Sequence, residues 1–175
     1  MSRPTRARVD LAAIRHNYRY AKHLAHGSRA VAVVKADAYG HGAVAVAKAL
    51  AAEVDAFGVA CIEEAMELRE SGIANTILLM EGVFEPAELA LVERHRFTPV
   101  IHSARQLNWM LDAKPTRRLD CWLKIDTGMH RVGLEPAELR PAHARLAACP
   151  HVDGVVVMTH FARADELDSQ ATQSQ

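Results

Sequence analysis

Short apolar runs alternate with amphipathic helical segments along this chain, and this alternation constrains the fold more than any other feature of the sequence. The apolar runs are RAVAVV (29–34), DAFGVACI (55–62), TILLM (76–80), FTPVIH (97–102), LDCWLKI (119–125) and DGVVVM (153–158). The predicted helices are LAAIRHNYRYAKHLAH (11–26), HGAVAVAKALAAE (41–53), EEAMELRES (63–71), EPAELALVERH (85–95), SARQLNWMLDAK (103–114) and EPAELRPAHARLAA (135–148). The runs are apolar throughout, which is typical of strands buried on both faces of a parallel sheet.

The pattern therefore predicts an α/β fold with roughly six βα steps, repeating about every 25 residues. A doubly wound sheet and a (β/α)8 barrel both fit. No GxGxxG motif follows the first strand, which weakens the dinucleotide-binding version of the former. We favour the barrel, although six strands cannot close an eight-stranded one. The chain also ends on ELDSQATQSQ, which begins like another helix, so we expect it to be a piece of a longer protein.

Composition narrows the possible partners and compartment. The 175 residues include 21 Lys and Arg against 21 Asp and Glu, which argues against a nucleic-acid or anionic membrane surface. No apolar run is long enough to span a membrane, and the basic N-terminus leads into no secretory signal. Cys61, Cys121 and Cys149 form no CxxC pair, so we expect reduced thiols, a cytoplasmic protein and no metal site.

Lys35 is the first candidate for chemistry, because it ends an apolar strand. Its stem must lie among apolar side chains, which disfavour the ammonium form and leave a nucleophilic amine that can form a Schiff base with an aldehyde. Tyr39 and the turn 40–42 (Gly-His-Gly) can supply a hydroxyl and close backbone approach to an anionic group. A lysine that simply reaches solvent at the rim of the sheet is the alternative.

The second cluster is WLKIDTGMHRVGL (122–134), in which a strand delivers Lys124 and Asp126 to the same edge. Arg131 follows, and its guanidinium suits a carboxylate. Two neighbouring cations repel, which chemical modification of Lys124 would relieve; a surface salt-bridge set is the alternative. In the third cluster, VVVMTHFARAD (155–165), His160 could stack on a flat ring, act as an acid or base, or be a structural histidine.

Together these segments resemble the alanine racemases, pyridoxal-phosphate enzymes whose N-terminal domain is a (β/α)8 barrel. AVVKADAYGHGA is similar to the family's cofactor-lysine motif, WLKIDTGMHRVGL and MTHFARADE are similar to two later motifs in the same order, and VDLAAIRHNYRY is similar to the family's start. The resemblance covers almost the whole chain. It implies that residues 1–175 form a partial barrel domain and that the family's β-rich C-terminal domain is missing.

The resemblance also implies a role for each candidate. Lys35 would be catalytic and hold pyridoxal 5'-phosphate as a Schiff base, Tyr39 would bind the cofactor phosphate, and His160 would lie against its ring. Arg131 would contact the cofactor and lie near the substrate carboxylate. Lys124 would be the lysine that many members carry in carbamylated form.

The implied reaction is the interconversion of L- and D-alanine, with Lys35 as one base. The second base would be a tyrosine from the partner subunit of a homodimer, outside this chain, so we expect the piece alone to be inactive. The alternatives are a non-catalytic pyridoxal-phosphate carrier, a related racemase or decarboxylase with a larger substrate, and a truncated product without enzymatic function.

Overall fold

The structure is a computed structural model that describes residues 4–175, and it contains all six predicted strands. The strands are β1 (Val31–Val33), β2 (Ala56–Val59), β3 (Thr76–Leu79), β4 (Phe97–Ile101), β5 (Leu119–Lys124) and β6 (Val152–Met158). The helices are α1 (Leu11–Leu24), α2 (Lys35–Gly40), α3 (Ala43–Leu50), α4 (Ile62–Glu70), α5 (Leu89–His95), α6 (Ala104–Asp112), α7 (Leu139–Ala147) and α8 (Ala171–Ser174), with short 3-10 turns η1 (Pro86–Glu88) and η2 (Pro136–Glu138).

The strand order decides between the two folds left open by the sequence. The strands follow one another as β1-β2-β3-β4-β5-β6, and β1 with β2, β4 with β5, and β5 with β6 pair in parallel. A doubly wound sheet reverses its strand order at a switch point, whereas a barrel adds each strand beside the previous one. The order is therefore that of an incomplete (β/α)8 barrel, which confirms the predicted fold class.

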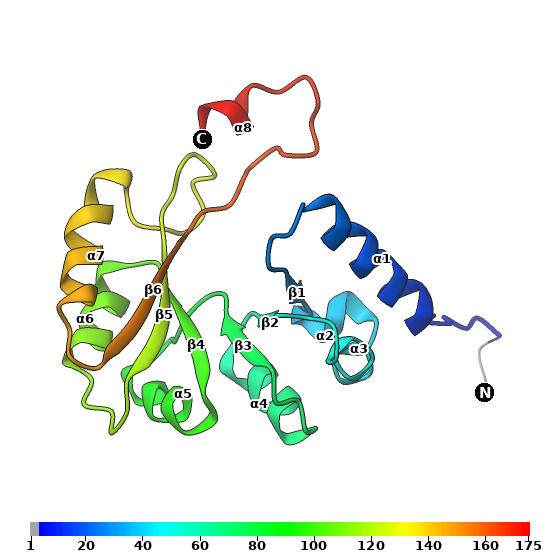
Figure 1. Cartoon of the computed structure of the whole chain (residues 1–175), viewed down its shortest axis with the longest axis horizontal. Helices are drawn as coiled ribbons and strands as arrows, with labels where there is room; N and C mark the ends of the chain where they lie inside the picture. The colour runs from blue at the N-terminus through cyan, green and yellow to red at the C-terminus, as the bar shows by residue number, and fades with distance from the viewer. Residues whose placement is uncertain (1–3) are drawn as a thin grey trace. The chain divides into compact units, whose positions relative to one another are not determined.

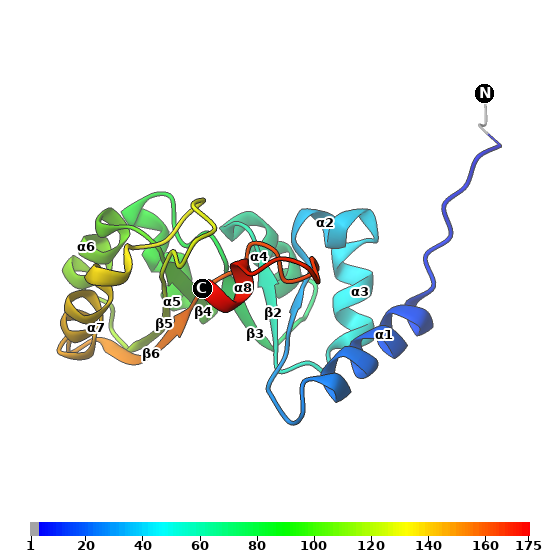
Figure 2. The same cartoon turned by 90° about the horizontal axis from the view of Figure 1, so that it is seen from above.

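The chain divides into two compact units, one up to Ile77 and one from Leu78 onward. In the first unit, β1 pairs with β2, and α1 packs against α3 (Figure 2). Asp10 caps α1, accepting hydrogen bonds from the backbone amides of Ala12 and Ala13 at 2.9 and 3.1 Å. The core of this unit includes Val46, Ala47, Phe57, Val59 and Leu68.

In the second unit, β4, β5 and β6 are neighbours, and α6 and α7 lie side by side (Figure 1). The core is formed by large side chains that are almost completely buried, including Leu79, Val92, Val100, Met110, Leu123 and Leu146. Each such side chain contributes about 1.5–3 kcal/mol relative to an exposed one.

Burial confirms the expectation of two-sided strands for β2 and β4, in which every residue is buried. The same expectation is wrong for β1 and β6. Val33 is 36% exposed, and Val156 and Val157 are 47% and 45% exposed. Within residues 4–175, β1 and β6 are the end strands of the order, so each has a neighbour on one side only.

Candidate active site

Lys35 lies at the end of β1, in the first unit. The Val34 amide donates to the Gly58 carbonyl at 2.8 Å, which carries the pairing with β2 one residue beyond Val33. Val34 is 2% exposed, and Lys35 follows it as a half-buried residue that opens α2. The lysine therefore comes two residues after the end of β1, but this strand is only partly buried, unlike the buried strand expected from the sequence.

The segment after Lys35 is a left-handed turn, which the sequence did not suggest. Ala36, Asp37, Ala38 and Tyr39 all have φ between 51° and 55° and ψ between 38° and 52°. This conformation costs roughly 1–2 kcal/mol per residue for L-amino acids, and four in succession are exceptional. Such strain persists only where surrounding contacts enforce it, and it clusters at functional sites.

Hydrogen bonds inside the first unit hold this turn. The Ala38 amide donates to Val34 O at 2.9 Å, and Gly42 N donates to Asp37 O at 2.9 Å. The Asp37 carboxylate accepts from Ala43 N at 2.7 Å, which also satisfies an amide in the first turn of α3.

Two further side chains act on the same turn. His41 Nδ1 lies 2.8 Å from the Ala38 carbonyl oxygen, so this nitrogen carries the proton and donates. Glu64, on α4, accepts from Ala36 N at 2.8 Å. Tyr39 is 62% exposed at the far end of the turn, which leaves its hydroxyl accessible.

Lys124 lies at the end of β5, in the second unit, and is 5% exposed. Burial lowers the pKa of its ammonium, the nearby Arg131 guanidinium lowers it further, and Asp126 partly opposes both. The charge conflict inferred from the sequence is thus present, with the larger contribution coming from burial.

Asp126 organises the loop between Lys124 and Arg131. Its Oδ1 accepts from Gly128 N at 2.9 Å and from His130 N at 3.0 Å, and these bonds hold the pKa of the carboxyl below its usual range. At Gly133 (φ 144°), a Cβ would lie 2.5 Å from Asp126 N, so only glycine permits this approach. The loop presents Arg131 as an exposed side chain.

The end of β6 lies beside the same loop. Lys124 pairs with Met158, and Thr159 follows with its hydroxyl donating to Ile125 O at 3.1 Å. The hydroxyls of Thr127 and Thr159 are 2.6 Å apart and hydrogen-bonded. His160 comes next and is exposed. The second unit therefore gathers Lys124, Arg131 and the start of the His160 segment, whereas Lys35 and Tyr39 belong to the first unit.

Sequence reasoning missed Glu64, Thr127 and the hydrogen bond between Thr127 and Thr159. Glu64 is the third residue of α4 and directly follows Glu63, and nothing in the sequence distinguishes the two glutamates. The two threonines are 32 residues apart in the sequence, so only the β5–β6 register brings them together.

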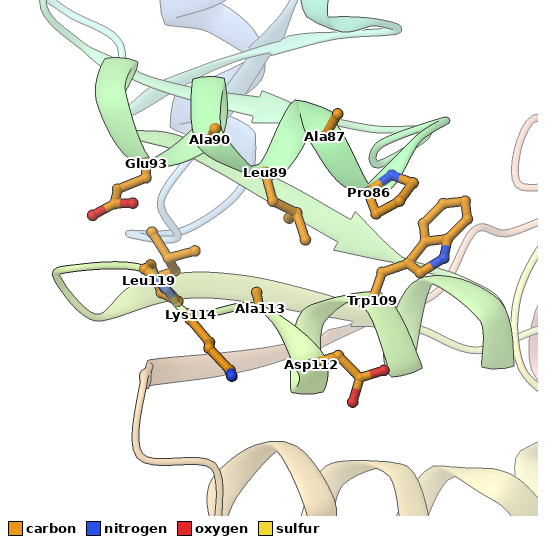
Figure 3. Close-up of a pocket in the computed structure, with 11 residues that line it drawn as sticks. Pro86, Ala87, Leu89, Ala90, Glu93, Trp109, Asp112, Ala113, Lys114 and Leu119 are labelled. Carbon is orange, nitrogen blue, oxygen red and sulfur yellow. The ribbon is translucent and has the colours of Figure 1, made fainter.

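A groove of about 440 Å³ lies between α5 and α6, with Leu89, Trp109 and Leu119 among its lining residues (Figure 3). Leu119 begins β5, whereas Lys124 ends it. Active sites of parallel α/β folds lie at the carboxyl ends of strands, so this groove is not the candidate site.

In the described part of the chain, no helix is long and apolar enough to cross a membrane.

Comparison with known proteins gives the family of the chain. The family model described as "Alanine racemase, N-terminal domain" matches residues 9–175. The chain is 57% identical over 173 residues to a catabolic alanine racemase of Pseudomonas aeruginosa, covering 99% of this chain and 48% of that protein. It is 56% identical to the catabolic alanine racemase of Pseudomonas putida, over 99% and 48% of the two chains.

Solved structures agree with the sequence relatives. The biosynthetic alanine racemase of P. aeruginosa superposes with a TM-score of 0.91 at 49% identity, covering 95% of this chain and 46% of that one. The alanine racemase of Acinetobacter baumannii gives 0.87 at 35% identity, over 95% and 47%. The chain spans about half the length of these relatives. With a matching family model over nearly all its residues, it belongs to the family of alanine racemase N-terminal domains.

Proposed function

We propose that the full-length protein carrying this chain is an alanine racemase that uses pyridoxal 5'-phosphate bound to Lys35. The observation that carries the proposal is the left-handed turn directly after Lys35, held by Asp37, His41 and Glu64 in a chain of this family. The turn is strained, and hydrogen bonds hold it in place next to a primary amine. Covalent catalysis requires a nucleophile that is positioned in this way before the substrate binds.

The chemistry of the available groups fits the cofactor. Lys35 offers a half-buried amine for the aldehyde, and Tyr39 an accessible hydroxyl for the phosphate. His160 would lie against the ring, and Arg131 would contact the cofactor. When bound, pyridoxal phosphate supplies a conjugated ring that withdraws electrons and acidifies the α-hydrogen of an amino acid.

The residues of this chain would then divide the remaining work. The Lys35 amine takes and returns the α-proton on one face of the substrate. Arg131 binds the alanine carboxylate through its guanidinium. A carbamate on Lys124 would pair with Arg131 instead of repelling it, and Asp126 would keep the loop in place. The second base would be a tyrosine of the partner subunit in a cytoplasmic homodimer, and this tyrosine would lie outside residues 1–175. These residues alone would therefore not racemise alanine.

The test uses Lys35→Ala in the full-length protein, with Lys48→Ala as the control, since Lys48 is exposed on α3. Borohydride reduction of the wild type with pyridoxal phosphate should label a peptide containing Lys35. Lys35→Ala should lose this label and reduce racemisation by roughly 10²- to 10⁴-fold or more, because it loses both anchor and base. Unchanged cofactor attachment in Lys35→Ala would refute the proposal.

A second candidate function is that of a non-catalytic carrier of pyridoxal phosphate. The loop that Asp126 organises favours the racemase over this carrier. That loop presents Arg131, and a carrier needs no site for an amino-acid carboxylate. Labelling of Lys35 without racemisation of alanine, or with racemisation of larger amino acids only, would favour the carrier or a racemase of another substrate.

A further inference from the structure

Glu64 joins two backbone segments of the first unit through one carboxylate. It is the third residue of α4, which Cys61 precedes. Its Oε1 accepts from the Ala36 amide at 2.8 Å, and its Oε2 accepts from the Ala60 amide at 2.8 Å. Ala60 follows β2 directly, and Ala36 follows Lys35 directly. The carboxylate therefore ties the start of α4 to the peptide beside the candidate catalytic lysine.

The Ala36 amide has its acceptor on another element, the Glu64 carboxylate of α4. The first amides of a helical turn have no partner inside the turn, and here the first internal bond is donated by Ala38. Ala36 is also the first residue with left-handed backbone angles. An acceptor at this amide therefore acts at the point where the chain changes from strand to strained turn.

A carboxylate suits this position better than an amide side chain. Both of its oxygens accept, whereas glutamine offers one accepting oxygen and one donating nitrogen. Glu64→Gln would therefore set an N–H group against the amide of either Ala36 or Ala60. Bonds from an N–H to a carboxylate are also stronger than bonds between neutral groups.

We propose that Glu64 is a positioning residue for Lys35: it holds the Ala36 amide so that the left-handed turn, and with it the lysine amine, is in place before the cofactor binds. This inference rests on the proposed function and adds to it a residue outside the site predicted from the sequence. Glu64 acts through Lys35 and needs no contact with the cofactor or the substrate.

The experiment compares Glu64→Gln with Glu67→Gln in the full-length protein freed of cofactor. Glu67 is an exposed residue of the same helix, and its replacement by Gln removes the same charge as Glu64→Gln. Hydrogen exchange of the segment containing Ala36 should be faster in Glu64→Gln than in the wild type, and unchanged in Glu67→Gln. Affinity for pyridoxal phosphate, followed by its visible absorbance, should fall about 10-fold or more in Glu64→Gln only.

Thermal unfolding of the cofactor-free proteins separates positioning from general stability. A melting temperature close to that of Glu67→Gln, together with faster exchange and weaker cofactor binding, supports the positioning role. Cofactor affinity equal to that of Glu67→Gln, or a loss of affinity only in proportion to a loss of folded protein, overturns it.

Glu64→Asp serves as a second variant if Glu64→Gln does not fold, because it keeps the charge but shortens the reach to Ala36. It should show the same faster exchange and weaker binding; wild-type values for both would overturn the inference. A wild type that binds no pyridoxal phosphate refutes the proposed function and the cofactor role of Glu64. The exchange comparison on those samples still decides whether Glu64 holds the Ala36 amide.

Discussion

Two lysines carry most of the proposed chemistry, and their surroundings differ. Lys35 is half-buried and leads into a strained turn, so the protein structure acts mainly on the backbone conformation at this lysine. Lys124 is 5% exposed on a regular strand, so the structure acts mainly on the charge of its ammonium group. A buried ammonium next to a guanidinium is unfavourable, and it persists where it serves a purpose other than stability.

Replacing Lys124 by Met should leave the folded full-length protein as stable as before or more stable, because an apolar side chain of similar length removes a buried charge. Where Lys124 carries the proposed carbamate, the same change should also lower racemisation, since Arg131 loses that anion; the pH dependence below is that of the unmodified lysine. The folded-state pKa of Lys124 is lowered, so the unfolded state binds more protons in the range between this value and the ordinary lysine pKa of about 10.4. The free energy of unfolding therefore rises with pH across that range.

Denaturant unfolding between neutral and alkaline pH checks this prediction. The wild type should gain stability as pH rises through this range, and Lys124→Met should lose that part of the dependence. Clear destabilisation of Lys124→Met at neutral pH would show instead that the ammonium is satisfied in the fold.

Among the elements, α1 depends on polar contacts rather than on burial. None of its residues is buried, and its side chains bind the neighbouring segments of the first unit. Arg19 forms a two-point ion pair with Glu53 at 2.6 and 2.7 Å, and Arg15 donates to Ala49 O. Lys22 lies 2.7 Å from Asp55, which also accepts from Ala30 N at 2.9 Å.

These contacts predict a loss of stability in acid. The Lys22 ammonium and the Ala30 amide lower the pKa of Asp55, so its contribution is present above the ordinary carboxyl value of about 4 and is lost as pH falls through the lower folded value. Asp55→Asn should lower the melting temperature at pH 7 by roughly 2–4 °C and reduce the dependence on pH below about 5.

Calorimetry of Asp55→Asn beside Glu70→Gln, a change at an exposed position of α4, checks this. If the melting temperature fell equally with pH in the wild type, Asp55→Asn and Glu70→Gln, the contacts of Asp55 would contribute nothing to stability.

At the scale of the whole molecule, the order of the strands exposes apolar surface at both ends of the series. Val33 on β1 and Val156 and Val157 on β6 are between 36% and 47% exposed. An end strand with apolar side chains and unpaired backbone groups is a template for association with other chains.

The 175-residue chain expressed by itself should therefore elute from size exclusion above its monomer mass of 19.2 kDa. Val157→Lys places a charge on the end strand and should shift the chain toward monomer. Leu167→Lys is the matched control, because Leu167 is 99% exposed and lies outside the strands. A monomeric wild type, or equal shifts in both variants, would contradict the role of β6; circular dichroism checks that each variant is folded.

The sequence by itself determined the strands, the helices that alternate with them, their order and the family. Six apolar runs and the helices between them are local patterns, and a local pattern is set by the periodicity of neighbouring residues. The motifs around Lys35, Lys124 and His160 were likewise contiguous. Only the tertiary structure decided the left-handed turn after Lys35, because alanine and tyrosine rarely adopt it and contacts from Asp37 and Glu64 enforce it.

The tertiary structure also decided the burial of Lys124 and the exposure of the valines of β6. Both depend on which strand lies on either side, and residue spacing does not encode that neighbour. The same reason applies to Glu64, whose contact spans 28 residues: the helix it belongs to was predictable from periodicity, but the amide it holds was not.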